Sequence, residues 1–194
     1  MSFVHPLDGA IKYIRRQPQP GFRVASAWNI IWRSADIGSE GIMILTNSHI
    51  LMHPDWIRCH LNHHSTDNIL ILGPFRSGSW EGPSTRVQWK EQGPEGRFKL
   101  LRCYSDSLRK KHLMAVGGWD EDFDGEWGFE DVDLSYRLQQ AGLEFVQGED
   151  VEVVHLPHRV TSPAPDGQKL GARNVRILAR KHPKLAYMEQ RWVP

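Results

Sequence analysis

The sequence has few cysteines and no excess of charge of either sign. Its two cysteines, Cys59 and Cys103, form no CxxC pair and no disulfide ladder. This favours a reducing compartment, although one bridge between them stays open. The 24 Lys and Arg residues nearly balance the 23 Asp and Glu residues, so the net charge is +1. A nucleic-acid-binding protein normally needs a basic face, so we expect no nucleic-acid partner.

Long hydrophobic runs are also missing. No stretch reaches the roughly 18 apolar residues that a membrane-spanning helix needs. The first residues, MSFVHPLDGAIKYIRR, lack the apolar core of a signal peptide. We therefore expect no membrane span and a cytoplasmic protein. The HExxH motif is absent too, which argues against a histidine-based metallohydrolase.

Histidine and tryptophan, by contrast, are abundant. The 194 residues include ten histidines and eight tryptophans, while 40% of the chain is apolar and 24% is charged. The length suits one domain with a sizeable core. Tryptophan rings can offer flat faces for sugars or bases, but any single tryptophan is more often core or interface filler.

Strand and helix patterns alternate along the chain. Apolar runs at 42–45 and 68–73 predict buried strands of a parallel sheet. Residues 74–97 are rich in Gly, Pro, Ser and charge, which predicts a long loop. Further strands are expected at 11–14, at 98–103 and in two pieces within 144–155, and helices at 22–35, 54–64, 107–116, 129–141 and 172–182. The predicted fold class is α/β.

Polar residues directly follow the first apolar run. Thr46-Asn47-Ser48-His49 comes after the predicted strand at 42–45, and ligands of open α/β sheets bind beyond the carboxyl ends of strands. In an extended chain Asn47 and His49 point the same way. Imidazole and amide oxygen can both ligate a divalent cation. The alternative is an ordinary turn or a hydrogen-bonded Asn–His pair.

A second histidine pair follows the apolar residues Val151, Val153 and Val154. His155 and His158 flank Leu-Pro, and a tight turn there lets both rings converge on one ion. The alternative is a pair of surface histidines.

The most informative stretch runs from Gly117 to Leu138 and combines acids with aromatic residues. Glu130, Asp131 and Asp133 open a predicted helix, where the helix dipole favours carboxylates. The helix dipole alone does not explain Asp131, because Asp131 shares a helix face with the apolar residues Leu134 and Leu138. An inward carboxylate is costly without a partner. Acids beside Trp119 and Trp127 suit a polyol ligand.

Four segments resemble the GT-A glycosyltransferases. Gly117-Gly-Trp-Asp-Glu-Asp-Phe and Trp127-Gly-Phe-Glu-Asp-Val-Asp-Leu-Ser-Tyr-Arg-Leu are similar to the acceptor-side motif of β-1,4-galactosyltransferases and polypeptide N-acetylgalactosaminyltransferases. Gly21–Asn29 and Ile42–Trp56 resemble the segments around the metal motif of family 2 enzymes. The resemblance covers residues 10–182. It implies a truncated GT-A-like mixed sheet flanked by helices, and a nucleotide-sugar donor, UDP-linked, with a glycan or other hydroxyl acceptor.

The resemblance also assigns residues to roles. Asn47 and His49 stand at the metal motif, and His155 or His158 at a later ligand, for Mn2+ or Mg2+. Asp131, with Glu130 as the alternative, stands at the acceptor-side carboxylate that takes the hydroxyl proton. The expected substrate-binding residues are Asn29, Trp119, Asp120, Trp127, Gly128 and Asp133.

The resemblance divides the chain into four parts within one GT-A-like domain, 1–194. They are a metal-motif portion (10–75), a lid-like loop (76–97), an acceptor-side portion (98–160), and a C-terminal linker and helix (161–194). Asn47 replaces the first aspartate of the metal motif, and the family's N-terminal nucleoside-binding portion has no counterpart. We therefore expect a second chain or homodimer mate to supply it. The alternative is a non-catalytic carbohydrate-binding or regulatory subunit.

Overall fold

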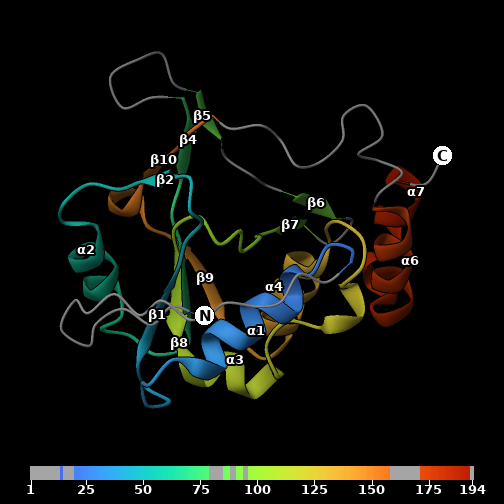
Figure 1. The fold of residues 1–194 in the computed structure, drawn as a ribbon, viewed down its shortest axis with the longest axis horizontal. Helices are drawn as coiled ribbons and strands as arrows, with labels where there is room; N and C mark the ends of the chain where they lie inside the picture. The colour runs from blue at the N-terminus through green and yellow to red at the C-terminus, as the bar shows by residue number, and fades with distance from the viewer. Residues whose placement is uncertain are drawn as a thin grey trace.

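The computed structural model describes residues 14, 20–78, 85–87, 91–93, 96–157 and 171–192. Its central element is a four-stranded sheet in the order β1-β8-β3-β9 (Figure 1). The strands are β1 (Ile42–Leu45), β8 (Asp106–Arg109), β3 (Ile69–Leu72) and β9 (Glu144–Gln147).

The central sheet is mixed. β3 runs parallel to β9, with Leu70 opposite Phe145, whereas β8 is antiparallel to both β1 and β3. The prediction of a parallel sheet is therefore wrong for β1, which lies at the edge of the sheet and pairs only with antiparallel β8. An apolar run reports burial but carries no information about the direction of the neighbouring strand.

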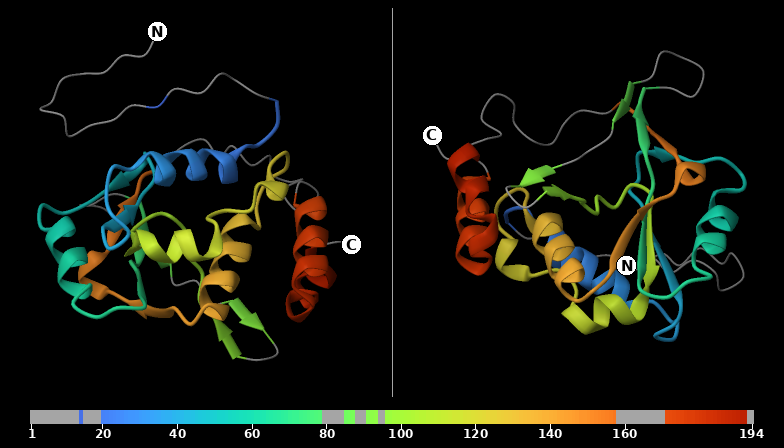
Figure 2. Two further views of the ribbon diagram at one scale, coloured as in Figure 1. Left: turned by 90° about the horizontal axis from the view of Figure 1, so that it is seen from below. Right: turned by 180° about the vertical axis from the view of Figure 1, so that it is seen from behind.

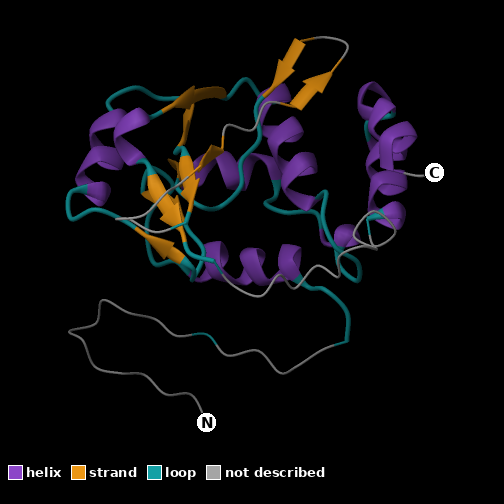
Figure 3. Ribbon diagram, turned by 90° about the horizontal axis from the view of Figure 1, so that it is seen from above, coloured by secondary structure: helices purple, strands orange, loops and turns teal. Residues whose placement is uncertain are grey.

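A second sheet has the order β2-β10-β4-β5. Its strands are β2 (Ile50–Leu51), β10 (Val153–His155), β4 (Phe75–Ser77) and β5 (Thr85–Val87), and a separate hairpin pairs β6 (Glu91–Gly93) with β7 (Gly96–Phe98). The hairpin extends away from the other strands (Figure 3). The prediction of a loop at 74–97 is thus wrong for the described residues of that segment, most of which form strands. Their pattern was missed because short polar strands lack the apolar alternation that reveals a strand.

Helices cover both faces of the central sheet (Figure 1). On one side α2 (Trp56–His63) packs against Ile69, Ile71 and Val153. On the other side α1 (Val24–Ser34), α3 (Lys110–Val116) and α4 (Glu130–Gln140) enclose a core that contains Leu70, Leu108 and Trp119. The α/β class and the mixed sheet flanked by helices are confirmed.

The C-terminal helices form an outer layer beyond α4 (Figure 2). α6 (Ala172–Lys181) and α7 (Tyr187–Trp192) bury Val175, Leu178 and Met188 against Phe123 and Phe129. Three short 3-10 helices complete the described elements: η1 (Glu121–Phe123), η2 (Glu149–Val151) and η3 (Pro183–Leu185).

Most predicted elements are present, with two shifts around residue 105. The helices expected at 22–35, 54–64, 129–141 and 172–182 are confirmed. The strand expected at 98–103 is limited to the end of β7, and the helix expected at 107–116 begins only at Lys110, because its first residues form β8. Buried Asp106, Ser105 and Ser107 give this strand a polar sequence that hides it. The strand expected at 11–14 lies outside the described residues except Ile14, which is not in a strand.

The described helices include none with the length and apolar character to cross a bilayer. Cys59 and Cys103 are both free thiols, so the disulfide that the sequence left open is not formed.

Candidate functional site

One pocket of about 760 Å³ collects most of the predicted site residues. Asn47, His49 and His155 line one wall, and Trp127, Gly128, Glu130 and Asp131 line another. The remaining lining residues come from α1 and the residue Phe22 before it, from the β1–β2 turn, from the segment between β7 and β8, from the start of α4 and from α7: Phe22, Val24, Trp28, Ser48, Leu100, Leu101, Arg102, Cys103, Tyr104, Phe129, Val132 and Met188.

The histidine wall is built where β1 ends and β2 and β10 meet. The Thr46 hydroxyl donates to the Tyr104 carbonyl at 3.0 Å, and the Leu156 N–H donates to the His49 carbonyl at 2.8 Å. Ser48 and His49 form a turn and are exposed, so the expected extended chain is wrong here. Even so, His49, Asn47 and His155 face the same pocket.

Not all of the metal ligands expected from the sequence are among the described residues. His158 lies outside them. Within the described ranges, no group of three or more His, Cys, Asp or Glu side chains is arranged to hold a metal ion. Of the metal ligands expected from the sequence, Asn47, His49 and His155 are described and line the pocket. Amide oxygen and imidazole are donor types that suit Mn2+ or Zn2+.

The carboxylate wall is the first turn of α4. Phe129, the residue before the helix, has a φ of 72°, and Gly128 has a φ of 85°. This left-handed pair turns the chain sharply, so that Glu130 and Asp131 meet the pocket at the amino end of the helix, where the dipole favours negative charge. A non-glycine residue in this conformation is a local strain often found at functional sites.

Two adjacent carboxyl groups in one apolar pocket disturb each other's ionisation. Burial raises the pKa of Glu130, and the charge of Asp131 raises it further. Burial also raises the pKa of Asp131, but the Trp119 indole N–H and the Arg102 guanidinium oppose that rise. Asp131 therefore stays the more acidic of the two, and it is the better candidate for an ionised base.

Trp119 and Asn29 lie behind the pocket and do not line it. Trp119 is only 2% exposed and stacks on Trp28 with ring centroids 5.4 Å apart. Its indole faces are thus not open to a substrate, contrary to the expectation of a stacking surface. Asn29 is 1% exposed and hydrogen-bonds the backbone of Trp119.

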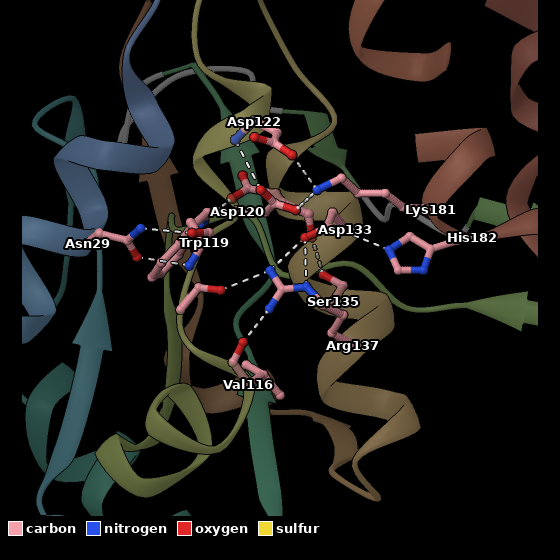
Figure 4. Close-up of polar contacts among 12 residues, drawn as sticks. Asn29, Val116, Trp119, Asp120, Asp122, Asp133, Ser135, Arg137, Lys181 and His182 are labelled. Carbon is pink, nitrogen blue, oxygen red and sulfur yellow. Dashed lines mark hydrogen bonds and ion pairs between the residues drawn. The ribbon is translucent and has the colours of Figure 1, made fainter. Parts of the chain in front are cut away.

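Asp133 and Asp120 join helices to one another (Figure 4). Asp133 is fully buried; its Oδ2 accepts from Nε and an Nη of Arg137 at 2.8 and 2.6 Å, and its Oδ1 lies 2.7 Å from Nε2 of His182. Asp120 pairs with Lys181 of α6. Both carboxylates pair with cationic side chains, and neither lines the pocket. The expectation that they contact substrate is therefore wrong, and they hold neighbouring elements together instead.

Other histidines are structural. Nδ1 of His60 lies 2.8 Å from the Ser107 hydroxyl, and Nε2 of His64 lies 2.8 Å from the same oxygen. Burial lowers the pKa of each to about 4, so both are neutral at pH 7. The abundance of histidine in the sequence is thus explained in part by the core.

Several residues that line the pocket were not predicted from the sequence, among them Trp28, Arg102, Tyr104 and Met188. Trp28 was predicted only as part of an apolar helix face, and Met188 had no signal at all. Arg102 and Tyr104 lie in a short segment without periodicity, and Cys103 between them has a φ of 57°. The Asp106 carboxylate holds this turn by accepting from the N–H groups of Arg102 and Cys103 at 2.7 Å each. The nearby polar run Ser105-Asp106-Ser107 is the one sequence signal that could have indicated it.

No family model matches the chain. A validoxylamine A glucosyltransferase of Streptomyces hygroscopicus subsp. jinggangensis is 37% identical over 79 residues, which is 41% of this chain and 18% of that protein. The crystal structure of GalNAc-T7 with UDP, GalNAc and Mn2+ covers 84% of this chain at a TM-score of 0.58 and 16% identity. A Pyrobaculum calidifontis mannosyltransferase in complex with GDP-Man and Mn2+ covers 91% at a TM-score of 0.51 and 14% identity.

The fold is that of the GT-A glycosyltransferases. Over 79 residues the chain is also similar in sequence to a glucosyltransferase. The chain spans 36% of the GalNAc-T7 chain and 46% of the mannosyltransferase chain.

Proposed function

We propose that this GT-A chain transfers a sugar from a nucleotide-sugar donor to a hydroxyl acceptor, with the reaction in the pocket between the histidine wall and the carboxylate wall. The observation that carries the proposal is the meeting of Asn47, His49 and His155 with Glu130 and Asp131 around one cavity of about 760 Å³. These residues come from distant parts of the sequence, and each wall suits a different half of glycosyl transfer.

Asp131 is the proposed base. It takes the proton of the acceptor hydroxyl as the oxygen forms its bond to the anomeric carbon, and the bond from that carbon to the donor phosphate breaks as the nucleoside diphosphate leaves. Glu130, whose pKa is raised by burial and by Asp131, is protonated more readily and can donate a hydrogen bond to an acceptor oxygen. Trp127 and Tyr104 line the same cavity and offer apolar ring surface to a sugar.

Asn47, His49 and His155 are the proposed ligands of a divalent cation, Mn2+ or Mg2+. When bound, such an ion stabilises the charge that develops on a leaving diphosphate. The two similar proteins of solved structure were crystallised with Mn2+, one with UDP and GalNAc and the other with GDP-Man. We extend the cation and a nucleoside diphosphate to this chain as part of the proposal, with UDP as the first candidate. A second chain or homodimer mate that completes the nucleoside site stays part of it.

A calorimetric titration of the purified chain with UDP and with GDP, each with and without Mn2+, tests the donor half. We expect binding that depends on Mn2+ and is lost in His49→Ala. A donor-sugar screen with mass-spectrometric detection of released nucleotide tests transfer, and Asp131→Asn is expected to abolish release while it preserves nucleotide binding. Equal affinity of wild type and His49→Ala would refute the metal role.

The second candidate is a carbohydrate-binding relative that does not transfer sugar. The ligand set favours it, because Asn47 brings no charge and no described group of three His, Cys, Asp or Glu residues surrounds an ion position. This candidate predicts that oligosaccharides bind the carboxylate wall with no dependence on Mn2+ and that no nucleotide is released from any donor.

A further inference from the structure

The buried indole of Trp119 reaches the proposed base from behind the pocket. Its Nε1 donates to Oδ1 of Asp131 at 2.9 Å. The Cys103 thiol approaches the same oxygen at 4.0 Å. From the described part of the chain, Oδ2 of Asp131 receives no hydrogen bond, while Asp131 itself lines the pocket. The two oxygens of one carboxylate therefore have different surroundings.

Trp119 is itself held through both its backbone N–H and its backbone carbonyl. The side-chain amide of Asn29 donates to the Trp119 carbonyl at 2.7 Å, and its oxygen accepts from the Trp119 N–H at 2.9 Å (Figure 4). The Trp32 indole donates to the same amide oxygen at 2.9 Å. Gly118 permits this close approach, because a Cβ there would collide with Asn29 and Trp32, and its φ is 78°. Trp119 consequently has little freedom to move.

We propose that Trp119 is a positioning residue for Asp131: its indole N–H fixes Oδ1 and leaves Oδ2 to accept the proton of an acceptor hydroxyl. The assignment of that proton to Asp131 rests on the proposed function, whereas the coupling of the indole to the carboxylate does not. A hydrogen bond to a carboxylate favours its charged form, so the indole also keeps Asp131 ionised in an apolar wall.

Other groups act on Asp131, and the experiment has to separate them from Trp119. Arg102 favours its ionised form. The acids that face it are Glu130 on the same helix and Asp106 from β8. The remaining titratable neighbours are Cys103 and Tyr104, both from the segment that precedes β8. None of these groups is altered when the indole N–H alone is removed.

Trp119→Phe removes that N–H and keeps an aromatic ring against Trp28. The titration of Asp131 is followed through its side-chain 13C carboxyl resonance, assigned with Asp131→Asn. We expect the midpoint of Asp131 to rise by about one pH unit in Trp119→Phe, because the charged form loses a hydrogen bond. A midpoint that stays where it is in the wild type overturns the proposal.

Trp56→Phe is the matched control, since Trp56 is a buried indole of α2 on the opposite face of the central sheet, and its N–H donates to the Ser105 hydroxyl at 2.8 Å. We expect its Asp131 midpoint to equal that of the wild type. An equal shift in both variants would mean that general loosening moves the titration, which also overturns the proposal.

A wild-type measurement keeps the test decisive if Trp119→Phe does not fold. The Trp119 Nε1–H proton resonance is expected to shift with the same midpoint as the Asp131 carboxyl and to lose this transition in Asp131→Asn. Independence of the two resonances contradicts the coupling. Neither readout needs a substrate. If no glycosyl transfer is detected, the proposed function fails, but the titrations still test the coupling of Trp119 to Asp131.

Discussion

The two walls of the pocket differ in how they are supported. The carboxylate wall rests on buried polar groups: Asp133 binds Arg137, and Asn174 donates to the Gly128 carbonyl at 2.9 Å and to the Phe123 carbonyl at 2.8 Å. The histidine wall is a turn at the surface, where Ser48 and His49 are exposed and Nδ1 of His49 lies 3.2 Å from the Ser48 hydroxyl.

This difference suits two kinds of chemistry. A base acts on a proton only over hydrogen-bonding distance, so its position has to be fixed before the substrate arrives. A cation and a diphosphate can instead organise flexible ligands around themselves, because ligand bonds repay the entropy of ordering. We infer that the carboxylate wall is preorganised and that the histidine wall is completed by what it binds. The variants below test this contrast, from the largest effect on stability to the smallest.

Asp133→Asn is expected to break the support of the carboxylate wall most severely. It leaves Arg137 and His182 without their buried carboxylate. Removal of one partner of a buried ion pair lowers the free energy of unfolding by about 3 kcal/mol. Urea unfolding measures the loss. Asp122→Asn is the control, because its pair with Lys181 is exposed and should contribute less than about 1 kcal/mol. Equal losses would show that the buried network is not what braces α4.

Asn29→Leu removes the amide that pairs with the Trp119 peptide. Two buried backbone groups then lose a partner, so we expect about 2 kcal/mol less stability. Thermal and urea unfolding give the value, and the double variant with Trp119→Phe gives the coupling between the two residues. Strict additivity would contradict the idea that Asn29 acts through Trp119.

Glu130→Gln tests the carboxylate wall through the pH dependence of the free energy of unfolding. Burial and the neighbouring Asp131 charge raise the pKa of Glu130 in the folded chain from its ordinary 4.5 to about 8. The folded wild type therefore binds more protons than the unfolded chain, and it loses stability as pH rises from 4.5 through the raised pKa. The neutral amide has no such loss. The variant is expected to gain about 1 kcal/mol relative to wild type between pH 5 and pH 8. A difference that does not vary with pH would show that Glu130 is ionised at little cost.

His49→Ala is expected to change stability least, by less than about 0.5 kcal/mol, because the side chain is exposed at a turn. Its effect should appear in ligand binding, as the loss of Mn2+-dependent nucleotide affinity measured by calorimetry. His53→Ala supplies a control at a histidine that bonds the Asp150 carbonyl, away from the pocket lining. A large loss of stability in His49→Ala would contradict a wall that is loosely built.

The sequence predicted the periodic elements and failed where burial is polar. Helix α1 was predicted from its apolar spacing, α2 from Pro54 and Asp55 at its start, and β3 from its apolar run; α4 and α6 were predicted as well. Strand β8 was missed because Ser105, just before it, and Ser107, within it, hydrogen-bond buried His60, a role that no local pattern reveals. Asp131 was expected to face inward from its helical face, and it does line the pocket.

By itself, the sequence determined where most of the helices lie, because periodicity and turn residues act locally. Only the tertiary structure decided which acids meet the pocket. Asp131 and Asp133 are two residues apart and look equivalent in the sequence, yet one touches the Trp119 indole at the pocket and the other is sealed between Arg137 and His182. That choice depends on Trp119 from the 117–119 turn and on His182 at the end of α6. Such long-range packing is the physical term that a local pattern does not contain.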